Sequence, residues 1–191
     1  MGPTTVELLL ARHGQTADNA GGLILGRRDP ELSDVGRAQA AQLADRAREA
    51  GVAAIWTSPL RRARQTADAV GSLLGARPAV LDDLIESDRG SWEGQPVRRL
   101  AEVSPELVRA FEAAAPDFAF PGGESIQQQL VRTRRALDVI AAGARPALVV
   151  AHAGTIRAAL LATGRAAPPE RSIAHGELLT ILWRPEDTRV H

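Results

Sequence analysis

Two short segments of the chain place a histidine directly after an apolar run, with a glycine close behind it. Residues 8–14 are Leu-Leu-Leu-Ala-Arg-His-Gly, and residues 148–154 are Leu-Val-Val-Ala-His-Ala-Gly. His13 supplies a nitrogen that is unprotonated for much of the time near neutral pH, and Arg12 supplies a planar, permanently charged group that suits phosphate. A histidine after a strand can also be a satisfied structural residue, so neither segment alone distinguishes the two. Together they predict an anion site with two imidazoles.

The two apolar runs also predict the elements that bring these side chains together. Each run is short, rich in branched residues and closed by a glycine, which is typical of a buried strand in a parallel sheet. We expect the central strand over residues 6–11 and a second buried strand over residues 147–151. Ligands of open α/β sheets bind at the carboxyl ends of the strands, so His13 and His152 should face each other there.

A third group is expected at the same edge of the sheet. Ser58 and Pro59 predict a helix cap and a first helical position directly after another strand, which places Arg62 one turn into that helix. Two guanidinium groups, two imidazoles and helix N-termini favour a tetrahedral dianion. These segments lack the carboxylate cluster that a metal-dependent mechanism uses, so we expect no metal and no other cofactor.

The remaining pattern predicts the fold class. Further strands are expected over residues 52–56, 79–81 and 177–183, the last at an edge, and helices over 33–50, 58–74, 97–103, 105–115, 124–142 and 155–163. In the first helix the buried seam is expected to be Val35, Ala38, Ala41, Ala44 and Ala47. This alternation favours an α/β fold, a three-layer α/β/α sandwich with a mostly parallel central sheet. The chain 1–191 is expected to form one domain, with a small helical insertion at about 87–122 over the site.

Composition narrows the partners and the compartment. The 23 acidic and 23 basic residues balance, which gives no reason to expect nucleic acid or an anionic membrane. All the basic residues are arginine and there is no cysteine, so no disulfide or thiolate chemistry is expected. The first residues lack the features of a signal peptide, and no apolar run approaches ~20 residues. We therefore expect a cytoplasmic protein.

Longer motifs extend this pattern along most of the chain. They comprise residues 8–16 with Asn19, then 26–33, 57–67, 84–94, 121–125 and 152–157. In this order they resemble the motifs of the histidine phosphatase superfamily, the phosphoglycerate mutase-like branch 1, over about residues 6–182. Gln15 and Ala153 stand where that family usually has glutamate and glycine, and neither departure removes a reacting group.

The resemblance implies a metal-independent phosphomonoesterase that works through a phosphohistidine. His13 would be the nucleophile that attacks phosphorus. Glu86 would donate a proton to the leaving oxygen and then act as the base for the hydrolytic water. The phosphoryl oxygens would be bound by Arg12, Asn19, Arg62 and His152, which would also stabilise the transition state.

Several assignments keep an alternative at this stage. The further substrate-binding candidates are Thr16, Gly26, Arg27, Glu124 and Ala153, of which Arg27 and Glu124 are placed near the substrate by resemblance alone. Thr16 either contacts the phosphate or only shapes the turn. Glu86 competes for its role with the nearby carboxylates Asp82, Asp83, Asp88 and Glu93. Trp92 is expected to pack, whereas Phe118 and Phe120 either form a wall over the substrate or seat the insertion.

Two other functions remain as alternatives. Mutases of the family carry a longer insertion with extra basic residues after the catalytic glutamate, so the short segment 87–121 disfavours mutase activity. A non-catalytic phosphate-binding module would usually have lost one of the reacting residues, and all are present here. The sequence leaves open which phosphorylated metabolite is the substrate, and leaves open the oligomeric state, with a homodimer as one alternative.

Overall fold

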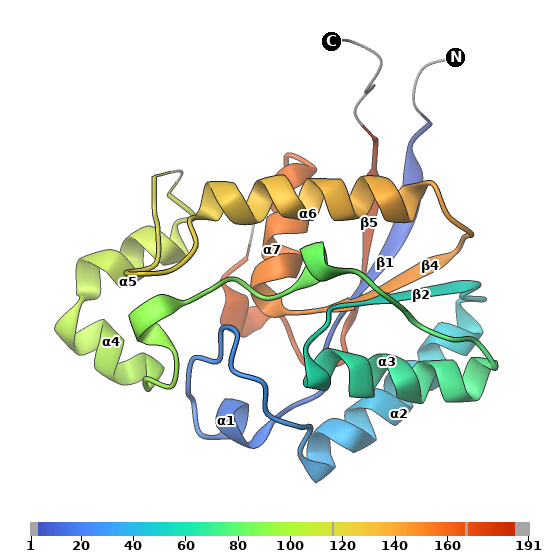
Figure 1. Cartoon of the computed structure of the whole chain (residues 1–191), viewed down its shortest axis with the longest axis horizontal. Coiled ribbons are helices and arrows are strands. Elements are labelled where there is room, and N and C mark those ends of the chain that lie inside the picture. The colour runs from blue at the N-terminus through green and yellow to red at the C-terminus, as the bar shows by residue number, and fades with distance from the viewer. Residues whose placement is uncertain (1–3, 116, 167, 186–191) are drawn as a thin grey trace.

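The centre of the protein is a five-stranded sheet with the order β3-β2-β4-β1-β5 (Figure 1). The computed structural model describes residues 4–115, 117–166 and 168–185. The strands are β1 (Val6–Arg12), β2 (Ala54–Thr57), β3 (Ala79–Val80), β4 (Ala147–Ala151) and β5 (Leu178–Trp183). Strands β1 to β4 run parallel to their neighbours, and β5 pairs antiparallel with β1 at one edge. The mostly parallel sheet and the edge strand are confirmed, but the middle strand is β4 and not β1.

Helices cover both faces of this sheet, which confirms the three-layer arrangement. Side chains alternate between the two faces of a strand. Leu8 and Leu10 of β1 therefore pack in one buried cluster with α6 (Ile126–Ala141) and α7 (Ala153–Ala162). Their neighbours Leu9 and Ala11 pack in a second cluster with α2 (Asp34–Glu49) and α3 (Arg61–Leu74). Residues 8–11 and 147–151 therefore supply both cores, which is why these stretches are apolar at every position.

The pairing of β1 with β4 sets the position of both histidines. The two strands are parallel, with Arg12 opposite Ala151. Beyond this pair, the backbone N–H of His13 donates to the carbonyl of Ala151 at 3.0 Å. The residues that follow, His13 and His152, thus leave the sheet side by side, as the two similar motifs predict.

Two details of the predicted helices are wrong. Helix α3 begins at Arg61 with Leu60 as its N-cap, and Ser58 accepts only a hydrogen bond from the N–H of Leu60. In α2 the buried residues are Gly36, Ala40, Leu43, Ala44 and Ala47. Val35 is 54% exposed because a seam spaced by three residues drifts off the face that a 3.6-residue helix buries.

The segment after β3 forms the insertion that lies beside one end of the sheet (Figure 1). The short elements of this segment are η1 (Asp82–Leu84), η2 (Gly90–Trp92), α4 (Val97–Val103) and α5 (Pro105–Glu112). Two other short elements lie outside it, namely α1 (Ala17–Ala20) after β1 and η3 (Glu170–Ser172) before β5. The insertion has its own core of Trp92, Leu100, Phe118, Phe120 and Ile126. The ring centroids of Phe118 and Phe120 are 4.9 Å apart, and those of Trp92 and Phe120 are 5.4 Å apart. The packing role of Trp92 is confirmed, and the two phenylalanines seat the insertion.

The described part of the chain contains no helix with both the length and the apolar content that crossing a membrane requires.

Close contact between two glycines holds the turn after β1 against α2. A Cβ on Gly14 would lie 2.3 Å from the carbonyl oxygen of Gly36, and a Cβ on Gly36 would lie 2.0 Å from that of Gln15. Both partners are backbone, so a side chain there forces the two segments apart. The turn that carries His13 therefore depends on small residues on both sides.

We predict that Gly14→Ala lowers the free energy of unfolding by about 1–3 kcal/mol, the usual cost of overpacking. Urea unfolding measures this change. Gly21→Ala is the control, because its Cβ would meet no atom closer than 3.6 Å and its φ is negative. Equal stability of the two variants would show that the close approach is not a constraint.

Candidate active site

A cavity of about 630 Å³ opens where β1 and β4 end, which is a volume typical of small-molecule sites. It extends from these strand ends to the insertion helices α4 and α5. The predicted residues that line it are Arg12, His13, Asn19, Gly26, Arg62, Glu86 and Ala153. The structure therefore brings together side chains from five separate parts of the sequence around one cavity.

The ring of His13 is held by a hydrogen bond at each nitrogen, and one of the two nitrogens is unprotonated. Its Nδ1 lies 2.7 Å from the carbonyl oxygen of Gly14, and because a carbonyl only accepts, Nδ1 carries the proton. The other nitrogen, Nε2, then keeps its lone pair and accepts a hydrogen bond from Nε of Arg62 at 3.1 Å. Burial, reinforced by the charges of Arg62 and Arg12, lowers the pKa of His13 well below its usual value. Nε2 is therefore an unprotonated nitrogen in a positive environment.

Arg62 is the most deeply placed charge of the site, with 1% of its surface exposed. Its Nη1 and Nη2 donate to the carbonyls of Arg28 and Gly26, at 2.5 and 2.9 Å. Burial lowers the pKa of Arg62 to about 10, against the opposing effects of Glu86 and Asp29. The guanidinium stays charged at neutral pH, and it ties the loop that follows α1 to the nucleophile candidate.

Two further nitrogens at the strand ends have no partner among the described residues. Nε of Arg12 is buried without a hydrogen bond, while its Nη1 donates to the carbonyl of Ile173 at 2.7 Å. Nδ1 of His152 is also buried without a partner, and its Nε2 lies 2.7 Å from the hydroxyl of Ser58. His152 does not belong to the described cavity lining, but its ring lies 5.2 Å from that of His13. Because buried polar groups normally form hydrogen bonds, the unpartnered donor of Arg12, which lines the cavity, indicates a ligand that brings an acceptor.

Glu86 lies on the opposite wall, held by hydrogen-bond donors. Its Oε1 accepts from the N–H of Ser87 at 2.8 Å and from Nε2 of Gln129 at 3.3 Å, and its Oε2 accepts from the N–H of Gly154 at 3.1 Å. Burial acts to raise the pKa of Glu86, but Arg89, these backbone N–H groups and Arg62 outweigh it and lower the pKa. Glu86 is thus a carboxylate in the ligand-free protein.

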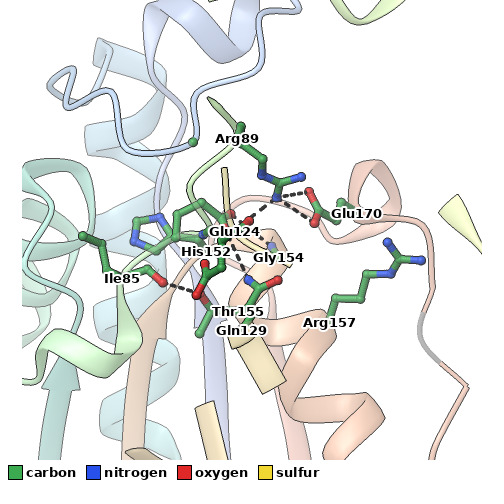
Figure 2. Close-up of polar contacts among 12 residues, drawn as sticks. Ile85, Arg89, Glu124, Gln129, His152, Gly154, Thr155, Arg157 and Glu170 are labelled. Carbon is green, nitrogen blue, oxygen red and sulfur yellow. Dashed lines mark hydrogen bonds and ion pairs between the residues drawn. The ribbon is translucent and has the colours of Figure 1, made fainter. Parts of the chain in front are cut away.

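Arg89 and Glu170 form a buried pair that the sequence did not reveal (Figure 2). Nη2 of Arg89 lies 2.8 Å from both oxygens of Glu170 and 3.6 Å from Oε1 of Glu86. Burial raises the pKa of Glu170, although Arg89 opposes this effect. Arg89 lies inside one of the motifs that resemble the family, so the sequence could have pointed to it. Glu170 lies in a proline-rich segment outside these motifs, so the sequence offered no reason to select it.

Gly154 explains how this group packs so closely. A Cβ at this position would lie 2.3 Å from Oε1 of Glu86 and 2.7 Å from Nη2 of Arg89. Only glycine therefore lets the start of α7 approach the carboxylate and donate its N–H.

His175 is a further residue that the structure places at the rim of the cavity. Its Nδ1 lies 2.8 Å from the carbonyl oxygen of His13, and its ring lies 5.4 Å from that of His13. Burial, followed by the charge of Arg12, lowers the pKa of His175 to about 4. His175 is therefore uncharged at neutral pH and adds no positive charge to the site.

The other candidates divide between the cavity and its supports. Thr16 is fully buried as the N-cap of α1, and its N–H and hydroxyl donate to Oδ1 of Asn19 at 3.2 and 3.0 Å. Thr16 therefore shapes the turn that holds Asn19 at the cavity. The carboxylates that compete with Glu86 are absent from the described cavity lining, namely Asp82, Asp83, Asp88 and Glu93.

Arg27 and Glu124 also lie outside the cavity lining that the structure describes. Arg27 is exposed and forms an ion pair with Asp88 at 3.5 Å. Glu124 binds Nε and Nη2 of Arg132 at 2.7 and 2.9 Å, and Arg132 donates in turn to the carbonyl of Ile85. The position of Glu124 is therefore that of a support for the segment that carries Glu86.

Within the described ranges, no three histidine, aspartate or glutamate side chains gather in a way that could hold a metal ion. The donors that face the cavity are mainly guanidinium, imidazole and amide groups, and these suit an anion.

We predict that His13 in the folded protein does not take up a proton near pH ~6.5, where an ordinary histidine titrates. Protonation would add a positive charge to a buried ring beside two arginines, so it is shifted to lower pH. NMR of the ring C–H signals between about pH 5 and 8 measures this. The same protein in urea is the control and should titrate near the ordinary value. A folded-state titration of His13 at or above that value would contradict the electrostatic argument.

Comparison with known proteins agrees with this geometry. The family model described as histidine phosphatase superfamily (branch 1) matches residues 8–191. The mycobacterial "Bifunctional protein Rv2228c" of Mycobacterium tuberculosis is 41% identical over 157 residues, which cover 81% of this chain and 43% of the relative. The chain thus spans less than half the length of that relative.

Two further relatives are more nearly of this chain's length. The "Metal-independent phosphoserine phosphatase" of Arabidopsis thaliana is 38% identical over 162 residues, covering 81% of this chain and 67% of the relative. A solved structure of the mycobacterial glucosyl-3-phosphoglycerate phosphatase Rv2419c with VO3 superposes with a TM-score of 0.80 at 29% identity, covering 91% of this chain and 90% of the other. With its family motifs gathered around one cavity, the chain belongs to branch 1 of the histidine phosphatase superfamily.

Proposed function

We propose that the protein is a metal-independent phosphomonoesterase that hydrolyses a small phosphorylated substrate through a phosphohistidine. The observation that carries this proposal is the state of His13. Its Nε2 is unprotonated because Nδ1 is held on the Gly14 carbonyl, and it faces a cavity with arginines on the same side. A neutral imidazole beside positive charge suits attack on a phosphate dianion.

In the first step, Nε2 of His13 attacks phosphorus and the bond from phosphorus to the leaving oxygen breaks. The leaving oxygen takes a proton from Glu86, so that an alcohol departs. In the second step, a water attacks the phosphohistidine while Glu86 accepts a proton from it. The nitrogen–phosphorus bond breaks, inorganic phosphate leaves and His13 returns to its neutral form. Arg12, Asn19, Arg62 and His152 bind the phosphoryl oxygens in both steps.

The acid role of Glu86 requires a proton that the ligand-free site does not favour. A phosphate dianion in the cavity adds negative charge beside Glu86, and a nearby like charge raises the pKa of a carboxyl group. Glu170 acts in the same direction, because it takes up part of the positive charge of Arg89. The proton therefore reaches Glu86 when the substrate binds, which couples substrate binding to the acid form.

Mutase activity is the alternative that relatives such as the "Phosphoglycerate mutase-like protein 4" of Arabidopsis thaliana raise, at 35% identity over 157 residues. A mutase must hold a second anionic group beside the phosphohistidine. The insertion arginines Arg98, Arg99 and Arg109 are absent from the described cavity lining, and Arg89 is paired with Glu170. The observed cavity therefore favours hydrolysis.

The nucleophile is tested by phosphate release from a panel of small phosphate esters in the presence of a chelator. The wild type should keep its activity with chelator, and His13→Ala should abolish release because no covalent intermediate can form. Mass spectrometry of the rapidly quenched wild-type reaction should locate a phosphoryl group on His13. Release that persists in His13→Ala would exclude this nucleophile, and exchange of phosphate between positions of a bisphosphorylated primer would indicate a mutase.

Glu86→Gln should slow esters with poor leaving groups far more than activated aryl esters, because a good leaving oxygen departs without full protonation. General acid catalysis is typically worth 10²–10⁴-fold, so the alkyl-to-aryl rate ratio should fall by roughly that factor. A ratio measured on one sample is independent of the folded fraction. The exposed neighbour Asp82 provides the control variant, Asp82→Asn, which should keep the wild-type ratio. An unchanged ratio in Glu86→Gln would remove the acid role.

A further inference from the structure

The cavity continues beyond the phosphoryl site into a region lined mainly by apolar side chains. They are Leu23, Ile24, Leu25, Trp92, Val97, Leu100, Val108 and Phe111, which we call the apolar wall. Because the apolar wall and His13 line the same cavity, a group attached to a bound phosphate reaches the wall without leaving the site. The total volume of about 630 Å³ has room for much more than a phosphoryl group.

Two segments distant in sequence build the apolar wall as one unit. The loop after α1 supplies residues 23–25, and η2, α4 and α5 supply the remainder. Backbone hydrogen bonds join the two segments. The N–H of Ile24 donates to the carbonyl oxygen of Gln95 at 3.0 Å, and the N–H of Val97 donates to the carbonyl oxygen of Gly22 at 3.1 Å. Leu100 and Trp92 are in addition part of the insertion core. The backbone of the fold therefore holds the wall in place. Its residues 23–25 belong to the same loop that Arg62 ties to His13.

The charged groups in this part of the cavity are partly engaged with the protein itself, and Nε of Arg89 and Nε of Arg157 are buried without a hydrogen-bond partner in the described part of the chain. Arg89 pairs with Glu170. Arg157 donates through Nη1 to the carbonyl of Phe111 at 2.7 Å and through Nη2 to that of Glu112, and its guanidinium lies over the Phe111 ring at 5.2 Å. The side chains of Glu112 and Glu170 also line this part of the cavity.

From this arrangement we infer that the substrates are phosphate monoesters of a largely apolar alcohol, whose hydrocarbon part lies against the apolar wall. The inference rests on the proposed phosphatase activity and specifies its substrate class. An apolar leaving group gains by transfer from water to the wall. The same wall offers few hydrogen-bond partners to a polyol.

The test uses ethyl, butyl and hexyl phosphate, which have similar leaving oxygens and differ in apolar area. We expect kcat/KM to rise along the series by roughly fourfold for each methylene that becomes buried, which corresponds to ~0.8 kcal/mol per buried CH₂. Hexyl phosphate should also be hydrolysed with a higher kcat/KM than 3-phosphoglycerate, whose alcohol carries a carboxylate, and than phosphoserine, whose alcohol is zwitterionic. A flat or falling series, or a preference for either of these two charged esters, would overturn the inference.

Variants of the wall separate this effect from folding. Val97→Asn and Val108→Asn place a polar group on the wall and should reduce the ratio of kcat/KM for hexyl to ethyl phosphate several-fold. Val103→Asn and Leu107→Asn are the controls on the same two helices, since these residues are exposed and do not line the cavity. Val97 is itself 48% exposed, between Leu107 at 40% and Val103 at 64%, so Val97→Asn costs as little burial as the controls do, whereas Val108 is half-buried against the insertion core.

The controls should keep the wild-type ratio, and an equal loss in both sets would overturn the assignment of the wall. Failure of the proposed function has a different signature, since no ester of any length would then release phosphate in a manner that depends on His13. A ratio that is unchanged in Val97→Asn and Val108→Asn would contradict the inference even where the phosphatase activity is established.

Discussion

The buried guanidinium of Arg62 is the interaction on which the site depends. Its three nitrogens donate to His13 Nε2 and to the carbonyls of Gly26 and Arg28, so one side chain links α3, the end of β1 and the loop after α1. Burying a charge is costly unless it is paired and hydrogen-bonded, and these acceptors supply the hydrogen bonds. Burial, followed by this charge, keeps the pKa of His13 and of His152 low. The residue that organises the loop therefore also helps to keep Nε2 of His13 unprotonated.

The opposite wall holds a buried carboxylate, Glu86, between several groups that set its pKa. Arg89 alone would hold Glu86 permanently ionised, since both are buried and within ion-pair distance. Glu170 lies closer to Arg89 than Glu86 does and takes both of its contacts at 2.8 Å. The charge available to Glu86 is thereby reduced, and its remaining partners are mainly backbone N–H groups and Gln129. Removing one charge from this set shifts the proton affinity of the others, because all of them lie in low dielectric.

How much the sequence predicts depends on whether the determining contact is local. The apolar runs of β1 and β4 predict buried parallel strands because every position packs on one of two cores, and their similar ends predict the paired histidines. The start of α3 and the seam of α2 were wrong because residue type alone does not fix the rotation of a helix on its neighbours. Glu124 looked like a substrate residue, but its partner Arg132 lies on the following helix and no local pattern reveals that pairing. Glu170 could not be found, since its role exists only through Arg89 in the fold.

The cavity has two halves that rest on different parts of the fold. One half lies at the ends of β1 and β4 and the start of α3, which belong to the two cores of the sheet. The other half lies against the insertion, whose aromatic core of Trp92, Phe118 and Phe120 is a third, separate cluster. Substitutions in the insertion can therefore change the shape and polarity of one half of the cavity while the cores that position His13 stay intact. The loop held by Arg62 contributes to both halves, so a substitution there would alter the apolar wall and the surroundings of His13 together.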